Sequence, residues 1–138
     1  MSLVPDLRFE FVVPGIALSL QASGESKEIW KEAVRNAARS ALPEGSWLPT
    51  EALAVTIFLF PAAVMQGDVD NRVKPILDAM NRCVYGDDEL IERVVMQKFE
   101  PGRVFAFGNP SDTLLRALNA QEPAVYIRIT NDLHEELF

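Results

Sequence analysis

The chain has 138 residues, of which 49% are hydrophobic and 24% are charged, and this composition is typical of one globular domain. We therefore expect residues 1–138 to form a single domain. Cys83 is the only cysteine and His134 the only histidine, which excludes an internal disulfide and a zinc site built from thiolates and imidazoles. The 20 acidic residues leave open a carboxylate site for a hard cation. The net charge of −7 argues mildly against a nucleic-acid partner.

The first six residues contain neither a basic leader nor a long apolar run. No stretch approaches the roughly 20 apolar residues that a membrane span requires. On these grounds the sequence predicts a cytoplasmic protein.

The first half of the chain predicts a strand, a helix and a second strand. Hydrophobic residues alternate with polar ones from Leu7 to Phe11, and this strand should end near Pro14. Apolar pairs recur every four residues from about Ser26 to Leu42, which indicates an amphipathic helix. The β-branched and aromatic run 54–60 predicts a strand covered on both faces. Trp30 and Trp47 are expected in the core.

The second half alternates helices and strands. The pattern predicts a helix from Asn71 or Arg72 to Arg82, a strand over 93–100, a short helix over 112–119 capped by Ser111, and a strand over 124–130. The acidic tail 131–138 should be flexible. The irregular order favours a compact α+β domain, with a mixed sheet of four to five strands and two main helices packed on it.

The stretch with the most chemical information is Gly67-Asp-Val-Asp-Asn-Arg-Val-Lys-Pro-Ile-Leu-Asp78, followed by Asp87-Asp88. Side chains two apart in an extended segment point the same way, so Asp68 and Asp70 should face one location. Positions four apart share a helix face, so Asp70, Lys74 and Asp78 should form one polar ridge. A turn after Gly86 could return the second acidic pair to the start of this helix.

Carboxylates that crowd together repel one another unless a cation compensates for their charge. Oxygen ligands without histidine or thiolate suit Mg²⁺ or Mn²⁺, and Mg²⁺ commonly completes its shell with a substrate phosphate. Phosphoryl transfer is the chemistry that such an ion serves. Lys74 would then stabilise negative charge that develops on phosphorus or help to protonate the leaving oxygen.

A purely structural interpretation also accounts for each piece of this stretch. Asp-x-Asp-Asn before a helix is typical of N-capping, and Lys74 with Asp78 is an ordinary surface ion pair. Gly-Asp-Asp is a common turn. The combination of two acids in register, a lysine at helical spacing and a second acidic pair favours the catalytic interpretation.

The run Asp68-Val-Asp-Asn71, then Lys74, Asp78 and Asp87-Asp88, resembles the signature of the RusA-type Holliday junction resolvases. The resemblance implies an α+β homodimer that uses Mg²⁺ or Mn²⁺ to cut four-way DNA junctions by paired, symmetric nicks. It also implies roles for individual residues. Asp68, Asp70 and Asp88 would bind the metal, Lys74 would be the catalytic lysine, and the supporting residues would be Asn71, Asp78 and Asp87.

Basic side chains that could contact DNA phosphates lie mainly on the first predicted helix. Four of them follow one another at i, i+4 spacing, namely Lys27, Lys31, Arg35 and Arg39. Arg72 and Arg82, near the acidic motif, are further candidates. The alternative is a solvated helix face on which Glu28 pairs with Lys31 and Glu32 with Arg35.

Two other functions remain open at this point. The acidic net charge favours a non-catalytic binding or assembly module whose carboxylate cluster is structural. A metal-dependent nuclease that acts on other nucleic-acid structures would carry the same motif.

Overall fold

The computed structural model describes residues 6–43, 45 and 48–137, and Trp47 lies outside these residues. It contains one mixed four-stranded sheet in the order β1-β4-β2-β3. The strands are β1 (Arg8–Pro14), β2 (Leu53–Phe60), β3 (Ile91–Lys98) and β4 (Ala124–Thr130). The helices are α1 (Gly24–Ala41), α2 (Val73–Met80) and α3 (Asp112–Leu118), with 3₁₀ turns at Asp70–Arg72 and Asp88–Leu90.

The α+β fold with a mixed sheet, predicted from the sequence, is confirmed, and the described residues form four strands and three α-helices. β4 is antiparallel to β1 and β2, whereas β3 runs parallel to β2. A parallel neighbour requires a crossover connection, and here residues 61–90 with α2 provide it. The acidic motif therefore lies within the crossover between two adjacent strands.

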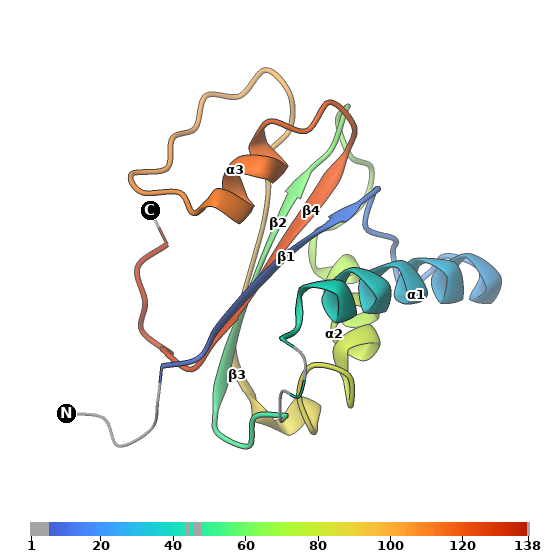
Figure 1. Ribbon diagram of the computed structural model, residues 1–138. Coiled ribbons are helices and arrows are strands. Elements are labelled where there is room, and N and C mark those ends of the chain that lie inside the picture. The colour runs from blue at the N-terminus through green and yellow to red at the C-terminus, as the bar shows by residue number, and fades with distance from the viewer. Residues whose placement is uncertain (1–5, 44, 46–47, 138) are drawn as a thin grey trace.

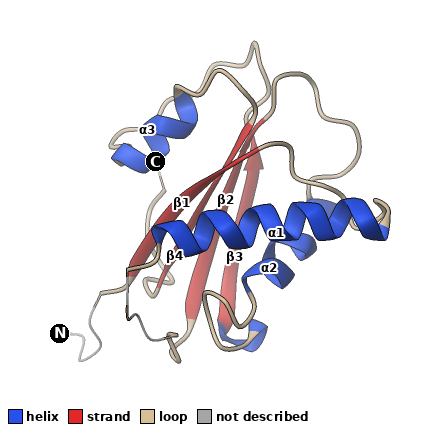
Figure 2. Ribbon diagram, turned by 45° about the vertical axis from the view of Figure 1, so that its right-hand side comes forward, coloured by secondary structure: helices blue, strands red, loops and turns tan. Residues whose placement is uncertain are grey.

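Helices α1 and α2 cover one face of the sheet and contact each other, while α3 lies over the other face (Figures 1 and 2). Strand alternation explains the two layers: Val55, Ile57 and Leu59 point into the core beneath α1 and α2, and Phe58 points to the opposite side. Trp30 is buried in the first core, as predicted. The structure thus divides into a large core that supports the crossover and a smaller one beneath α3.

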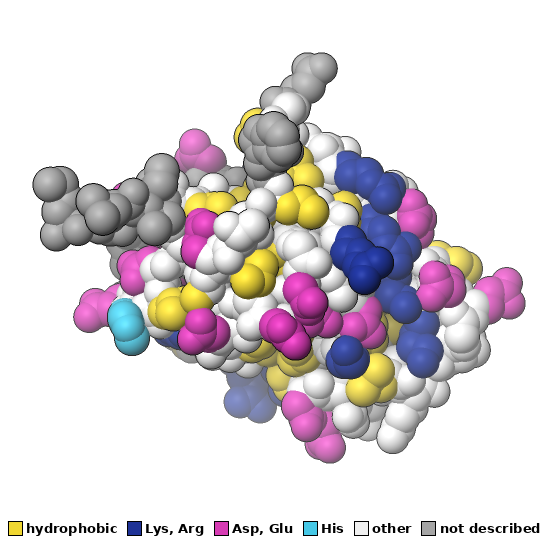
Figure 3. Space-filling model, turned by 90° about the horizontal axis from the view of Figure 1, so that it is seen from below, with side chains coloured by type: hydrophobic (Ala, Val, Ile, Leu, Met, Phe, Trp, Pro, Cys, Tyr) yellow, Lys and Arg dark blue, Asp and Glu magenta, His cyan; other side chains and the backbone are white. Residues whose placement is uncertain are grey.

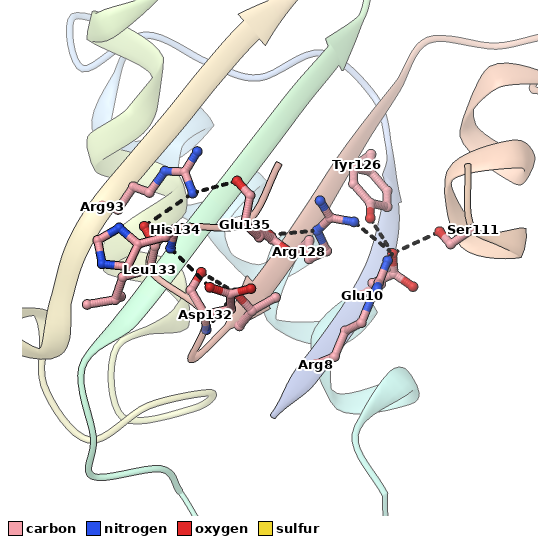
Figure 4. Close-up of polar contacts among 11 residues, drawn as sticks. Arg8, Glu10, Arg93, Ser111, Tyr126, Arg128, Asp132, Leu133, His134 and Glu135 are labelled. Carbon is pink, nitrogen blue, oxygen red and sulfur yellow. Dashed lines mark hydrogen bonds and ion pairs between the residues drawn. The ribbon is translucent and has the colours of Figure 1, made fainter. Parts of the chain in front are cut away.

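A polar network covers the sheet on the α3 side (Figure 4). The carboxylate of Glu10 accepts hydrogen bonds from the hydroxyls of Ser111, at 2.8 Å, and Tyr126. Ser111 also caps α3, as predicted, by accepting a hydrogen bond from the Leu114 amide. Burial and the hydrogen bond to Glu10 raise the pKa of Tyr126. The network joins α3 to β1 and β4.

The tail that the sequence predicts to be flexible makes specific contacts in the structure up to residue 137. The Arg93 guanidinium donates to the carbonyls of Leu133 and Glu135, and the side chain of Glu135 pairs with Arg128 at 3.2 Å (Figure 4). Arg128, on β4, is buried, and the carboxylate of Glu135 compensates its positive charge. The sequence does not reveal this pairing, because Arg128 and Glu135 meet only after folding, and the flexibility of the tail stays a prediction.

Several element boundaries differ from the predicted ones by one or two residues. α1 begins at Gly24 because the side chain of Ser23 caps it and accepts from the Ser26 amide. α2 ends at Met80, before Arg82, and β3 begins at Ile91. No helix in the described part of the chain is long and apolar enough to cross a bilayer.

Candidate active site

The segment that leads from β2 to the acidic motif is anchored by Arg72. Its guanidinium donates to the carbonyls of Ala17, in the loop after β1, and Gln66. Gly67 has a φ of 83°, which residues with a side chain rarely adopt. This glycine turn separates the Gln66 carbonyl, which accepts from Arg72, from Asp68. Arg72 therefore joins two loops at the start of the motif.

Helix α2 holds the motif against the core through one face and presents Lys74 and Asp78 on the other. Ile76, Ala79 and Met80 are fully buried, whereas the side chain of Lys74 is 57% exposed. The helix is preceded by the 3₁₀ turn Asp70–Arg72, so Asp70 is at its entrance. Of the polar ridge predicted over Asp70, Lys74 and Asp78, the structure forms the pair between Lys74 and Asp78 at 2.8 Å, whereas Asp70 lies in the turn before α2.

A tight turn after α2 returns the chain to this ridge. Arg82 adopts a left-handed conformation, and its amide donates to the carbonyl of Tyr85 at 2.7 Å. The buried Tyr85 hydroxyl donates to the carbonyl of Leu77 at 2.8 Å. Gly86 and Asp87 follow, and Asp88 then lies beside Lys74. The turn and the buried tyrosine together bring the second acidic pair to α2.

Lys74 lies between two carboxylates. Its Nζ is 2.8 Å from Oδ1 of Asp78 and 4.0 Å from Oδ2 of Asp88. The hydrogen bond and charge of Asp78, with a smaller contribution from Asp88, raise the pKa of Lys74 above its usual value. Lys74 is therefore positively charged at neutral pH and can stabilise an anion or donate a proton, but it cannot act as a base there.

Asp88 has an unusual environment for a carboxylate. Its Oδ1 is buried and has no hydrogen-bond partner among the described residues, although a buried acceptor without a partner is costly. Burial, followed by the negative charge of Asp88, raises the pKa of the neighbouring Tyr85. This unpaired oxygen is suited to a cation, because a hard divalent ion takes carboxylate oxygens as ligands.

The other acids of the motif are placed differently. Asp68 and Asp70 are exposed. Asp87 caps the second 3₁₀ turn by accepting from the Glu89 amide at 3.1 Å. Within the described residues, which include all these aspartates, no three Asp, Glu, His or Cys side chains are grouped so that they could hold a metal ion. The shared metal site of Asp68, Asp70 and Asp88 stays a prediction.

The paired charges predict a measurable titration effect. Replacing Asp78 with asparagine should lower the pKa of Lys74, because the largest contribution to its elevation is lost. The ion pair between Lys74 and Asp78 stabilises the folded state as long as Lys74 is protonated. This contribution is fully present below the pKa of lysine in the unfolded chain, about 10.4, and is lost as the pH rises through the higher pKa of Lys74 in the folded protein. NMR titration of the Lys74 side chain in both proteins tests this; an unchanged pKa in Asp78→Asn would contradict it.

In a comparison with protein-family models, residues 22–130 match a model described as endodeoxyribonuclease RusA. The chain belongs to the RusA endodeoxyribonuclease family. The match extends from just before α1 to the end of β4 and includes the whole crossover. No curated protein matches the chain. The resemblance inferred from the acidic motif is thus confirmed, and a nuclease is the activity that RusA membership supports.

Four of the 13 basic residues of this RusA-family chain lie along α1. Figure 3 shows several Lys and Arg side chains next to one another, beside acidic ones. Lys31 pairs with Glu28 at 3.0 Å, and Arg35 pairs with Glu32 at 3.0 Å, as the alternative interpretation of this helix expects. Arg39 also reaches Glu32, at 3.4 Å. The α1 stripe, defined as Lys27, Lys31, Arg35 and Arg39, is thus partly neutralised.

The start of the α1 stripe is connected to the acidic motif. The ammonium of Lys27 donates to the carbonyl of Leu20 at 3.0 Å, and the Leu20 amide donates to the carbonyl of Asn71 at 2.9 Å. Asn71 thus contributes its backbone to this contact. The chain of hydrogen bonds places the beginning of α1 next to the entrance of α2.

Arg72 was a candidate for phosphate contacts, but its guanidinium is directed at two backbone carbonyls. Arg72→Ala should lower the free energy of unfolding by about 2 kcal/mol, because charged hydrogen bonds to two loops are lost. Lysine should not restore the loss, because one ammonium cannot reproduce the forked geometry of arginine. Urea denaturation of both variants measures the effect, and full rescue by lysine would contradict this interpretation. Arg82 is exposed and remains a candidate for DNA.

Sequence reasoning missed two side chains that shape the site. Tyr85 looks like an ordinary aromatic core residue in the sequence, and its hydrogen bond to α2 depends on the left-handed turn at Arg82. Glu100, a buried acid after β3, bonds to Met65 across 35 positions of sequence. No local pattern marks either contact.

Proposed function

We propose that this RusA-family protein is a Mg²⁺- or Mn²⁺-dependent endonuclease that resolves four-way DNA junctions by paired phosphodiester nicks. The observation that carries the proposal is the position of Lys74 beside Asp88, whose buried Oδ1 accepts no hydrogen bond from the residues that the structure describes. The Lys74 ammonium is a charged donor that suits a phosphate, and the Asp88 carboxylate beside it is an acceptor that suits a cation. Family membership supports the nuclease activity itself.

In this proposal the aspartates have distinct roles. Asp88, together with Asp68 and Asp70, would hold the divalent cation, and Asp78 would keep Lys74 protonated and oriented. When bound, the cation supplies positive charge that polarises the phosphate and lowers the pKa of water. The Lys74 ammonium would lie against the phosphate, where it stabilises the extra negative charge of the transition state. Asn71 and Asp87 would support the segments that carry these groups.

Symmetry and local positive charge support a junction as the substrate. Paired cuts in a junction require two active sites, and a two-fold homodimer matches a two-fold substrate. The α1 stripe, which begins beside the entrance of α2, would contact backbone phosphates, and Arg82 would add a further contact. A DNA substrate is consistent with the cytoplasmic location that the sequence predicts.

The test compares a synthetic four-way junction with a linear duplex of the same sequence, with and without Mg²⁺. Wild type should cut the junction in two symmetric positions only when Mg²⁺ is present. Asp70→Asn should not cut and should keep the wild-type melting temperature, since Asp70 is exposed. The matched control is Asp112→Asn on α3, which neutralises one exposed aspartate on the opposite side of the sheet.

Each result assigns a function. Cutting of flaps or RNA in place of junctions would support a nuclease with another substrate and overturn the junction assignment. A wild-type protein that cuts no nucleic acid and binds no Mg²⁺ would support the binding or assembly module. Symmetric, Mg²⁺-dependent nicks confined to junctions would establish the proposal.

A further inference from the structure

A buried carboxylate outside the acidic motif contacts the segment that delivers it. Glu100 follows β3 and is only 4% exposed. Its Oε2 accepts a hydrogen bond from the Met65 amide at 2.7 Å, two residues before Gly67. A buried carboxylate that accepts a hydrogen bond from a loop amide is unusual, because burying a charge is costly unless the charge is paired.

Two cations make this burial possible. Lys98 lies 3.4 Å from Oε2 of Glu100, and Arg103 lies 3.7 Å from Oε1. The hydrogen bond from Met65, followed by these positive charges, holds the pKa of Glu100 below its usual value. Glu100 is therefore ionised at neutral pH and offers Met65 a charge-assisted acceptor.

The Glu100 contact is positioned to hold the segment that ends at Asp68 and Asp70. The Phe99 amide donates to the carbonyl of Leu59 at 2.8 Å, which ties Glu100 to the end of β2. Beyond β2, the amide of Met65 is held by Glu100, and the next carbonyl, of Gln66, is held by Arg72. Two successive residues are thus clamped by side chains from different parts of the fold, immediately before the motif.

We infer that Glu100 is a positioning residue for the proposed nuclease reaction. Its side chain sets the path of the backbone over residues 65–70, and this path determines where Asp68 and Asp70 lie. The inference rests on the proposed function for its catalytic consequence. The effect on residues 65–70 is independent of it. Glu100 would act through the Met65 amide and would touch neither the DNA nor the cation.

Two substitutions separate the hydrogen bond from the charge. Glu100→Ala removes the acceptor, and Glu100→Gln keeps an oxygen acceptor of the same length without the charge. Hydrogen exchange of the metal-free, full-length protein should become about tenfold faster at the Met65 amide in Glu100→Ala, with smaller increases over 66–70. Glu100→Gln should exchange at a rate between those of wild type and Glu100→Ala, because it keeps an oxygen acceptor but loses the charge. Leu114→Ala, which removes a buried side chain from α3, is the control for general destabilisation.

Kinetics on the four-way junction provide the second measurement. Glu100→Ala should lower kcat about tenfold and leave KM within about twofold, because misplaced acids weaken the reaction more than DNA binding. Glu100→Gln should recover most of kcat. Equal exchange in Glu100→Ala and wild type, or an increase spread over the whole chain as in Leu114→Ala, overturns the inference. A wild type that cuts no junction overturns the proposed function, while the exchange measurement still decides the role of Glu100.

Discussion

Lys74→Ala should lower the rate of junction cleavage by about 10²- to 10³-fold, the usual cost of removing one group that stabilises transition-state charge. The loss should appear in kcat, since the ammonium acts where charge develops rather than along the DNA backbone. Stability should hardly change, because the side chain is 57% exposed and its ion pairs are at the surface. Single-turnover cleavage at saturating Mg²⁺ measures the chemical step.

The control for this variant is Arg116→Ala, which removes one positive charge from an exposed position of α3, on the opposite side of the sheet. It should retain the wild-type rate. Lys74→Arg keeps the charge but replaces a compact ammonium with a planar group, so it should recover only part of kcat. If Lys74→Ala cleaved junctions at the wild-type rate, the proposed role of Lys74 would be wrong.

Asp88→Asn should abolish the stabilisation of the protein by Mg²⁺. A ligand that binds only the folded state at 100 times its dissociation constant adds about 2.7 kcal/mol to the free energy of unfolding. Wild type should therefore melt at a higher temperature in MgCl₂ than in NaCl of equal ionic strength, and Asp88→Asn should not. Without Mg²⁺, the variant should be at least as stable as wild type, because its amide removes a negative charge whose Oδ1 is buried.

Glu122→Gln is the matched control, because it neutralises one exposed carboxylate before β4 and should keep the full response to Mg²⁺. Differential scanning calorimetry of the three proteins, with cleavage assays on the same samples, completes the test. An equal Mg²⁺ response in wild type and Asp88→Asn would exclude Asp88 as a metal ligand.

Local contacts at the site could be anticipated from spacing. Lys74 and Asp78 lie four residues apart in a segment with helical periodicity, so their ion pair follows from helix geometry. The Ser111 cap and the Lys31 and Arg35 pairs on α1 follow in the same way. By contrast, Arg72 carries the same charge as Lys31 and Arg35, but its guanidinium donates to the carbonyls of two loops. The residues around Arg72 in the sequence do not indicate these contacts.

The sequence alone determined the α+β class and the acidic motif, because hydrophobic periodicity and short-range spacing depend on the geometry of single helices and strands. Membership in a nuclease family rests on the match of the sequence to the RusA family model. Only the tertiary structure decided that Asp88 lies beside Lys74 and that Glu100 holds Met65. Those contacts join residues 14 and 35 positions apart. They depend on a left-handed turn at Arg82 and on the parallel crossover from β2 to β3, which no local pattern specifies.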